Sequence, residues 1–414
     1  MKVLLITPPT KHMITIVEPK LVMEEVGFYP PLGLMYLASF LEKETQHEVS
    51  IIDSVVEGLD YPALEAKIKE FEPDLVGIQS FTQTLVDAVK VAEMVKAIDK
   101  DIHVCMGGTH ATLYPQETIA LPHVDTAIVG EGETSFTHLV ESLSKDQDLS
   151  QVSGLLFKKN GHIARNEPKP YTKELDRLPF PARHLTPVEK YYSIIEADSP
   201  MTTMISTRGC PYNCIFCLGS VERTLYRERT PGNVVDEMEQ CVKEGFKDIF
   251  FWDSIFTINK RRVMSICQEI HERGLKITWS VRSRIDQTDE EMLQKMRAAG
   301  CRRIQYGIES GSNRTLSSLR KGISLKQISE GVARVKSLGF TVYGDFMVGS
   351  PGETREDVIN TINFAIALDL DYVNFSVVTP YSHTELYDLG LKRGLYNKDY
   401  WKEFAENPRE GFVP

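Results

Sequence analysis

The stretch Thr207-Arg-Gly-Cys-Pro-Tyr-Asn-Cys-Ile-Phe-Cys217 determines how the rest of this chain is interpreted. Its cysteines, Cys210, Cys214 and Cys217, have the spacing C-x-x-x-C-x-x-C on a loop that opens with Gly209. Three thiolates this close together can hold one small metal cluster, and they are one ligand short of completing a four-iron cube. A structural site recruits a fourth ligand, so the open corner predicts a place where a substrate or cofactor binds.

The alternative is a zinc site. The spacing differs from that of electron-carrying ferredoxins, and the chain has no C-x₂-C…C-x₂-C zinc pattern. A zinc site would need a fourth ligand from elsewhere, either a histidine or one of Cys241, Cys267 and Cys301. None of these has ligand spacing to the loop, so the pattern favours the cluster.

Composition and charge narrow the class of protein. A length of 414 residues predicts two domains, and a net charge of −11 without a block of Lys or Arg argues against nucleic-acid binding. Seven cysteines, an odd number, fit a reducing compartment. Met1–Pro9 is too short for a signal peptide, and no apolar run of about 18 residues predicts a membrane span. We expect a soluble cytoplasmic protein, and the abrupt ending Gly411–Pro414 leaves open that the chain continues.

The first 150 residues alternate short β-branched runs with amphipathic stretches. Strands are expected at Val3–Ile6, Val49–Asp53, Leu75–Gln79, His103–Met106 and Thr126–Val129, and helices near Gly33–Lys43, Tyr61–Phe71, Leu85–Ile98 and Ser135–Leu143. This alternation predicts a parallel, doubly wound (Rossmann-like) α/β sheet, whose ligands bind beyond the carboxyl ends of the strands. Those ends carry Thr7–Thr10, Gln79–Thr82, Gly107–His110 and Gly130–Glu133.

A connector is expected over residues 151–195, where five prolines follow a hairpin turn at Asn160-Gly161. A second α/β alternation then fills residues 196–385, and residues 386–414 form a tail. The strands of this second alternation are expected at Thr202–Ser206, Asp248–Trp252, Ile277–Ser280, Arg303–Tyr306, Thr341–Met347 and Tyr372–Val378. Its helices are expected near Asn233–Glu244, Arg261–Arg273, Asp289–Ala299, Leu325–Leu338 and Arg355–Leu368. Six such repeats predict a (βα)₆ partial barrel with the cysteine loop at its C-terminal mouth.

The cysteine loop after a first barrel strand resembles the radical S-adenosylmethionine (SAM) superfamily. Supporting segments are Phe251–Asp253, Ser280–Asp286, Gly307–Ser312, Gly349–Glu353 and Thr379–Tyr381. The first half, with Pro30–Gly33, Gly107–Thr112 and Val129–Glu133, looks like the cobalamin-binding domain that one branch of this superfamily carries. The resemblance covers roughly residues 1–385.

The resemblance implies that Cys210, Cys214 and Cys217 hold a [4Fe–4S] cluster whose fourth iron binds SAM. It also implies a set of SAM-contacting residues: Phe216, Asp253, Arg282, Glu309, Ser310, Gly349 and Gly352. Alternatives stay open for some of them. Phe216 can simply pack the loop, Arg282 and Arg284 can meet the SAM carboxylate or pair with Asp286, and the glycines can merely shape a turn.

For the first domain the resemblance implies a cobalamin site made by Gln79, Ser80, Thr82, Gly107, Gly108, His110, Gly130, Glu131 and Gly132. The glycine pair allows a close approach by the nucleotide tail, although it can also be a bare strand-to-helix turn. Many cobalamin proteins use Asp-x-His-x-x-Gly to place a histidine under cobalt. Asp101-Ile-His103 begins this motif, but position 106 is Met and the segment lies in an expected strand. The lower axial ligand stays unassigned, with His12 as a candidate.

The implied activity is a cobalamin-dependent radical SAM C-methyltransferase that uses a 5′-deoxyadenosyl radical and methylcobalamin. A cyclisation, ring contraction or oxidation with the same cofactors is the alternative enzyme, and a cobalamin or Fe–S sensor is the alternative from another class. An external donor of the flavodoxin or ferredoxin type would supply electrons.

The segment after Tyr381 bears on the substrate, because only residues 382–414 follow it. A short tail would leave the barrel mouth open, which favours a peptide or protein substrate, such as a residue of methyl-coenzyme M reductase, over a small molecule. Tyr381 is a candidate for the active-site mouth, and no general base can be named.

Overall fold

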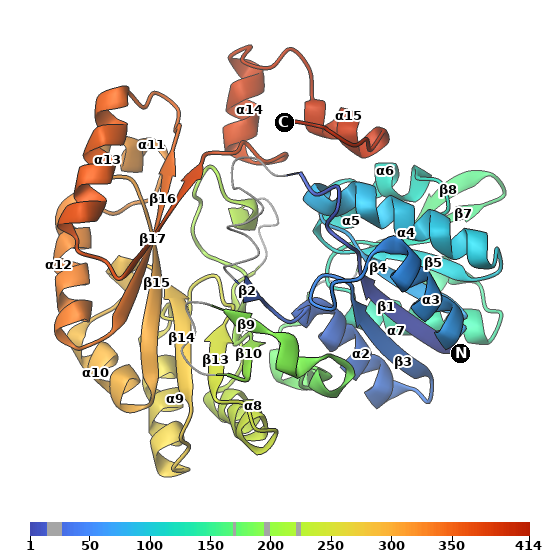
Figure 1. The fold of residues 1–414 in the computed structure, drawn as a ribbon, viewed down its shortest axis with the longest axis horizontal. Helices are drawn as coiled ribbons and strands as arrows, with labels where there is room; N and C mark the ends of the chain where they lie inside the picture. Colours follow the sequence, from blue (N-terminus) through green and yellow to red (C-terminus); the bar gives the residue numbers. More distant parts are fainter. Residues whose placement is uncertain (15–26, 169–170, 194–198, 221–224) are drawn as a thin grey trace.

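The computed structural model describes residues 1–14, 27–168, 171–193, 199–220 and 225–414, which form two α/β lobes side by side (Figure 1). The first lobe is built on a seven-stranded sheet in the order β3-β1-β4-β5-β6-β7-β8. Its parallel strands are β1 (Lys2–Thr7), β3 (Glu48–Asp53), β4 (Leu75–Gln79), β5 (His103–Gly107) and β6 (Thr126–Ile128). The strand order reverses between β1 and β4, and ligands bind at such a switch point in doubly wound sheets.

Helices cover both faces of this sheet, because its strands are apolar on both sides. Val3 and Leu5 of β1 join the core under α2 (Leu32–Glu44) and α7 (Glu133–Ser144). Leu4 and Ile6 point the other way, as alternate strand residues do. They join the core under α3 (Tyr61–Phe71), α4 (Leu85–Ile98), α5 (Thr109–Leu113) and α6 (Pro115–Ala120). The doubly wound fold expected from the sequence is confirmed.

The hairpin at Asn160-Gly161 belongs to the first sheet and not to the connector that the sequence placed there. Strand β7 (Leu155–Lys159) pairs antiparallel with β6, and β8 (His162–Arg165) pairs with β7. Buried Leu155 and Leu156 fill the core, which explains why the strand continues the sheet. Further on, β9 (Tyr192–Ser193) pairs with β2 (Gly27–Phe28). Pro170, one of the connector prolines, lies outside the described residues.

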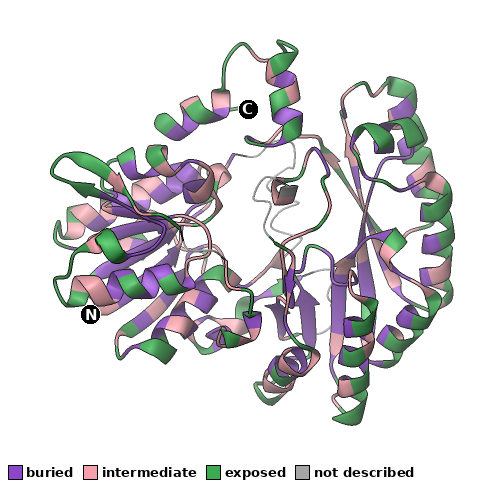
Figure 2. Ribbon diagram, turned by 180° about the vertical axis from the view of Figure 1, so that it is seen from behind, coloured by how far each residue is buried: buried purple, intermediate pink, exposed green. Residues whose placement is uncertain are grey.

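The second lobe is an open parallel sheet in the order β10-β13-β14-β15-β16-β17. Its strands are β10 (Met201–Met204), β13 (Asp248–Phe251), β14 (Thr278–Ser283), β15 (Cys301–Glu309), β16 (Thr341–Val348) and β17 (Tyr372–Val377). The helices are α8 (Pro231–Lys243), α9 (Lys260–Glu272), α10 (Glu290–Ala298), α11 (Asn313–Ser318), α12 (Leu325–Ser337) and α13 (Arg355–Ala367). Figure 2 shows most strands of both lobes buried and the outer helix faces exposed, whereas β8 and β17 are largely exposed. This is the expected partial barrel, although β15 extends three residues beyond its expected end, to Glu309.

The cysteine loop is set off from the barrel by a short two-stranded ribbon. Strand β11 (Thr207–Arg208) pairs antiparallel with β12 (Arg227–Glu228), so the two ends of the cysteine loop lie side by side. Single-turn 3₁₀ helices complete the connections, at Thr82–Thr84, Leu149–Gln151, Leu175–Arg177, Arg183–Leu185, Val188–Lys190, Leu218–Ser220 and Ile285–Gln287.

The last segment of the chain returns to the first lobe (Figure 1). Helix α14 (Glu385–Lys392) lies against the cysteine loop, where the Leu386 N–H donates to the Ile215 carbonyl at 2.9 Å. Helix α15 (Tyr400–Glu406) then places buried Trp401 and Phe404 in the core of the first lobe. The segment expected to be a tail beside the barrel mouth therefore bridges the two lobes. Among the described residues, no helix combines the length and the apolar character needed to cross a membrane.

Candidate functional site

The three cysteines lie on one loop and form no disulfide bond. Cys214 is buried, Cys210 is half-buried and Cys217 is exposed. Cys210 and Cys217 approach the same glycine: a Cβ on Gly219 would lie 3.5 Å from Cys217 Sγ and 4.0 Å from Cys210 Cβ. The loop is anchored by the Ile215 N–H, which donates to the Leu319 carbonyl at 3.3 Å. These thiols therefore fit a cluster that reaches the surface on one side.

The other four cysteines lie elsewhere. Cys241, Cys267 and Cys301 belong to the barrel core, and Cys105 belongs to the core of the first lobe. Burial raises the pKa of Cys241 and of Cys267 to about 12, so these thiols stay protonated. Across the described residues, no three Cys, His, Asp or Glu side chains are close enough to hold a single ion. A cube-shaped cluster spreads its cysteines more widely than one ion does. The fourth zinc ligand considered from the sequence is not supplied by these core cysteines.

Two cations face the cysteine loop. Burial raises the pKa of the Cys210 and Cys214 thiols, while the charges of Arg284 and Lys321 act in the opposite direction. Arg284 is buried, and its guanidinium lies 3.9 Å from the centre of the Tyr212 ring. Positive charge of this kind stabilises thiolates and an anionic cluster.

Arg284 also pairs with Asp286, at 3.0 and 3.2 Å, as the sequence left open. Arg282 has a different environment: its guanidinium lies 4.1 Å from the centre of the Trp252 ring and donates to Gln305 Oε1 at 3.3 Å. Burial lowers the pKa of Arg282. Arg282 therefore lies beside an aromatic wall, whereas Arg284 is the arginine that pairs with Asp286.

The SAM-contacting residues predicted from the sequence gather at the strand ends of the barrel, but their contacts differ. Glu309, with φ +69°, accepts a hydrogen bond from Lys321 Nζ at 2.7 Å. Ser310 Oγ lies 3.2 Å from Thr361 Oγ1 and accepts from the Ser312 N–H at 3.2 Å. Gly349 and Gly352 have φ +91° and +77° in the turn after β16. These positions remain predictions for SAM binding.

Phe216 and Asp253 have structural contacts that the sequence did not show. Phe216 packs against Ile215, Leu319 and Leu386, which supports the packing role left open for it. Asp253 is fully buried and accepts hydrogen bonds from the Ser206 N–H at 2.6 Å and the Thr207 N–H at 3.0 Å. It therefore fixes the turn between β10 and the cysteine loop.

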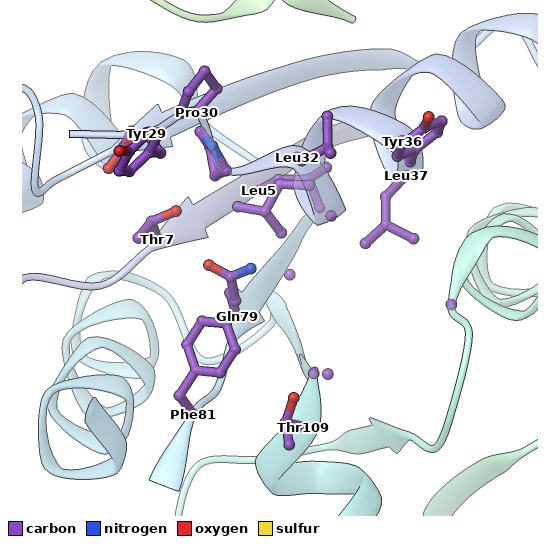
Figure 3. A pocket seen from close by; sticks show the side chains of 18 of the residues that line it. Leu5, Thr7, Tyr29, Pro30, Leu32, Tyr36, Leu37, Gln79, Phe81 and Thr109 are labelled. Carbon is purple, nitrogen blue, oxygen red and sulfur yellow. The ribbon is translucent and has the colours of Figure 1, made fainter. Parts of the chain in front are cut away.

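A cavity of about 1080 Å³ lies between the two lobes (Figure 3). The first lobe lines it with strand ends and the 27–37 segment, and the second lobe contributes Thr203, Ile205, Thr207, Arg208, Gly209, Arg227, Trp252 and Ser254. Figure 3 shows Gln79 at the end of β4 in the middle of the lining, with Leu5 and Leu32 on one side and Phe81 and Thr109 on the other. Both the switch point of the sheet and the start of the cysteine loop therefore open on one space.

Six of the nine residues predicted to bind cobalamin line this cavity: Gln79, Gly107, Gly108, Gly130, Glu131 and Gly132. Gly108 has φ +109°, and a Cβ there would lie 2.8 Å from the Ser80 carbonyl oxygen, so this close turn requires glycine. Four lining residues have buried hydroxyls without a partner in the described structure: Thr7, Ser54, Thr203 and Thr207. A glycine ridge, mostly apolar walls and unpaired hydroxyls fit a large ring with polar edges.

The other three residues predicted to bind cobalamin do not line the cavity and lie behind its wall. They are Ser80, Thr82 and His110. Ser80 Oγ donates to the Gly107 carbonyl at 2.9 Å, and Thr82 Oγ1 shares a hydrogen bond of 3.0 Å with His110 Nδ1. His110 is fully buried, and its Nε2 has no partner in the described structure. The three side chains support the strand ends from within.

None of the described residues that line the cavity is a histidine. His103 lies in β5 with Nε2 2.9 Å from Thr126 Oγ1, as expected for a strand residue. His12 Nδ1 lies 2.9 Å from Asp87 Oδ1 and its Nε2 lies 3.3 Å from Glu410, so both ring nitrogens are engaged. Tyr381 packs on the core of the first lobe beside Trp401 and does not line the cavity.

Several lining residues were missed by the sequence interpretation. Tyr29 and Trp252 form an aromatic wall with ring centres 4.9 Å apart. Arg208 and Arg227 meet Glu131 of the first lobe. Arg208 is part of the cysteine stretch itself, but nothing in its neighbourhood indicates its distant partner.

Comparison with known proteins agrees with this geometry. The model of the radical SAM superfamily matches residues 204–365, and the model of the B12 binding domain matches residues 19–140. An uncharacterized methyltransferase of Pyrococcus horikoshii is 38% identical over 98% of this chain and 86% of its own length. An anaerobic magnesium-protoporphyrin IX monomethyl ester cyclase of Rubrivivax gelatinosus is 29% identical over 90% of this chain and 69% of its own.

Among solved structures, the radical SAM methyltransferase TsrM from Kitasatospora setae, with cobalamin and a [4Fe-4S] cluster bound, has the same fold. The TM-score is 0.76, with 20% identity, over 95% of this chain and 75% of the other. The two family models match segments of the two lobes described above, the B12 binding domain in the first lobe and the radical SAM model in the second. The chain therefore belongs to the radical SAM superfamily, in the branch that carries a B12-binding domain.

Proposed function

We propose that this protein is a cobalamin-dependent radical SAM C-methyltransferase that methylates an unactivated carbon. One observation carries the proposal: a single cavity is lined both by the strand ends of the B12-binding domain and by Thr207, Arg208 and Gly209 at the start of the cysteine loop. A methyl group can pass from one cofactor to a substrate activated by another only where both open on the same space.

When bound, the cluster, SAM and cobalamin supply a 5′-deoxyadenosyl radical and a transferable methyl group. The residues of this chain bind and orient these cofactors and shield them from solvent. Cys210, Cys214 and Cys217 hold the cluster, and the Gly107-Gly108 turn admits the cobalamin tail. The aromatic wall of Tyr29 and Trp252 lines the space between the cofactors.

For the substrate we propose a peptide or protein segment, with an external flavodoxin- or ferredoxin-type protein as the electron donor. The support is that Phe81 and Trp252 keep partly exposed aromatic surface at the cavity, which an apolar side chain can cover. Cyclisation, ring contraction or oxidation is the competing activity, because one relative is named as a cyclase.

The test begins with anaerobic purification and reconstitution with iron, sulfide and hydroxocobalamin. We expect about four irons and about one cobalt per chain. With SAM, a reductant and a peptide library, we expect S-adenosylhomocysteine and 5′-deoxyadenosine together, and a product heavier by one methylene. The triple Cys→Ala variant of the cysteine loop is the control without a cluster.

The other activities predict different results. A cyclase makes 5′-deoxyadenosine without S-adenosylhomocysteine, and its product loses hydrogen. A sensor binds both cofactors without cleaving SAM.

A further inference from the structure

The cysteine loop leaves and re-enters the fold through a neck that carries two facing positive charges. In the β11–β12 ribbon, Arg208 is the register partner of Arg227. Like charges directly opposite one another on neighbouring strands destabilise the pairing. The neck of the loop therefore needs negative charge from another part of the chain.

The first lobe supplies this charge. Glu131 accepts two hydrogen bonds from Arg227, from Nη2 at 2.6 Å and from Nη1 at 3.0 Å, and it lies 3.2 Å from Arg208 Nη1. Arg208 Nη2 donates to Glu133 Oε1 at 2.5 Å. Charge-assisted and bidentate pairs of this kind are the strong hydrogen bonds of proteins. We call Arg208, Arg227, Glu131 and Glu133 the Arg–Glu clamp.

The clamp is largely shielded from water. The exposed fractions of the side chains are 2% for Arg227, 10% for Glu133, 15% for Arg208 and 22% for Glu131. Burial raises the pKa of Glu131, but its hydrogen bond to Arg227 and the charge of Arg208 outweigh burial and hold the pKa below its ordinary value. Glu131 thus stays ionised, and the clamp stays charged.

The same residues border the cavity. Gly130, Glu131 and Gly132 all line it, and Gly132 is the residue from which α7 starts, with Glu133 as its first residue. A ligand that fixes this strand end also fixes the carboxylates of Glu131 and Glu133. Those carboxylates then fix the neck of the cysteine loop.

We propose that the Arg–Glu clamp is a positioning device that couples cobalamin binding in the first lobe to the conformation of the cysteine loop. This inference rests on the proposed function, since it takes cobalamin as the ligand of the first lobe. The coupling is reciprocal: cobalamin stabilises the assembled loop by the same factor by which the assembled cluster tightens cobalamin binding.

The experiment measures the dissociation constant of hydroxocobalamin from its visible spectrum, in anaerobic protein with and without the reconstituted cluster. In the unsubstituted protein the cluster tightens binding by about fivefold or more. Glu131→Gln keeps the shape of the side chain and removes its charge. In that variant the dissociation constants with and without the cluster become equal within about twofold, so the effect of the cluster disappears.

A matched variant controls for the loss of a carboxylate. Glu239→Gln removes an exposed ion-pair partner of Arg273 on the outside of the barrel and keeps the full coupling. Arg208→Lys retains the positive charge and keeps part of the coupling, whereas Arg208→Gln loses it. The rate at which a chelator removes iron, with and without hydroxocobalamin, gives a second readout of the same coupling.

Two outcomes overturn the clamp and leave the proposed function standing. One is equal affinity for hydroxocobalamin with and without the cluster in the unsubstituted protein. The other is an effect of the cluster in Glu131→Gln that is as large as the effect in the unsubstituted protein. An unsubstituted protein that binds no cobalt would contradict the proposed function and the clamp together.

Discussion

Lys321 Nζ donates a hydrogen bond to Glu309 Oε1 at 2.7 Å, and both side chains are buried. Glu309 has φ +69° at the end of β15, in the left-handed region that few residues other than glycine adopt. A Cβ on Gly307 would lie 2.5 Å from Glu309 Oε1 and 2.8 Å from Lys321 Nζ, so the strand leaves room for this pair. The backbone of β15 thus places an ion pair beside the cysteine loop.

Removing the lysine alone leaves Glu309 buried without its partner. We expect Lys321→Met to lower the free energy of unfolding by about 3–5 kcal/mol, measured by urea unfolding of the cluster-free protein. The double variant Glu309→Gln with Lys321→Met removes both charges and recovers most of this loss. A double variant as unstable as the single one would show that the two side chains do not compensate each other.

We predict that the Gly107-Gly108 turn contributes to cobalamin binding and not to assembly of the cluster. Gly108→Ala would place a Cβ 2.8 Å from the Ser80 carbonyl oxygen and force the turn away from β4. We expect the affinity for hydroxocobalamin to fall by about tenfold or more, while the iron content after reconstitution is unchanged.

Gly161→Ala is the matched control for this substitution. Gly161 also has positive φ, +77°, but no atom lies within 4 Å of its Cβ position. It therefore carries the backbone penalty without the contact. Equal cobalamin affinity in the two variants would place the Gly107-Gly108 turn outside the cofactor site.

His110 makes stability depend on pH. Burial lowers the pKa of His110 to about 3, whereas an unfolded histidine has a pKa of about 6.5. The unfolded chain binds a proton below pH 6.5 that the folded chain does not, so stability is full above that pH and falls as the pH falls. Between pH 7 and pH 5 this group removes about 2 kcal/mol from the free energy of unfolding.

Urea unfolding at pH 7, 6 and 5 tests this assignment. His110→Gln should lose about 2 kcal/mol less stability over this range than the unsubstituted protein. Burial also lowers the pKa of His103, to about 4, so part of the pH dependence remains in both proteins. His162→Gln, on exposed β8, is the control and keeps the original slope. An unchanged slope in His110→Gln would contradict the assignment.

Helix α15 is predicted to stabilise the first lobe and not the barrel beside which α14 lies. Trp401 is buried in the core of the first lobe, and its indole N–H donates to the Pro380 carbonyl at 2.9 Å. Trp401→Ala should cost about 3–5 kcal/mol. Hydrogen exchange should show the loss of protection in β1 and α4, with little change in β14 or β15. Lys402→Ala, at an exposed neighbouring position, should leave protection unchanged.

Local sequence patterns predicted a segment correctly where the residues of that segment alone determine its structure. Leu75–Gln79, Tyr61–Phe71 and Leu85–Ile98 have the bounds expected from their apolar periodicity. The cysteine loop could also be recognised, because its three cysteines lie within a few positions of one another. Both features depend on contacts between residues close in the sequence.

The remaining features depend on partners that are distant in the sequence. Glu131 was assigned to cobalamin from its motif, but its carboxylate oxygens accept hydrogen bonds from Arg227, 96 positions later. Trp401 lies in the segment that was expected to be a short tail leaving the barrel mouth open, yet it fills the core of the first lobe. Periodicity reports which face of an element is apolar and does not report which other element covers that face.

The return of the chain to the first lobe has a consequence for synthesis on the ribosome. Leu4 and Ile6 emerge first, but the core that they enter also contains Tyr387, Trp401 and Phe404. At roughly 5–20 residues per second, that core waits on the order of tens of seconds for its last side chains. During this time the nascent first lobe exposes an apolar surface that a chaperone can bind. The first lobe therefore reaches its final state only after the whole barrel core, which ends at Leu370, has been synthesised.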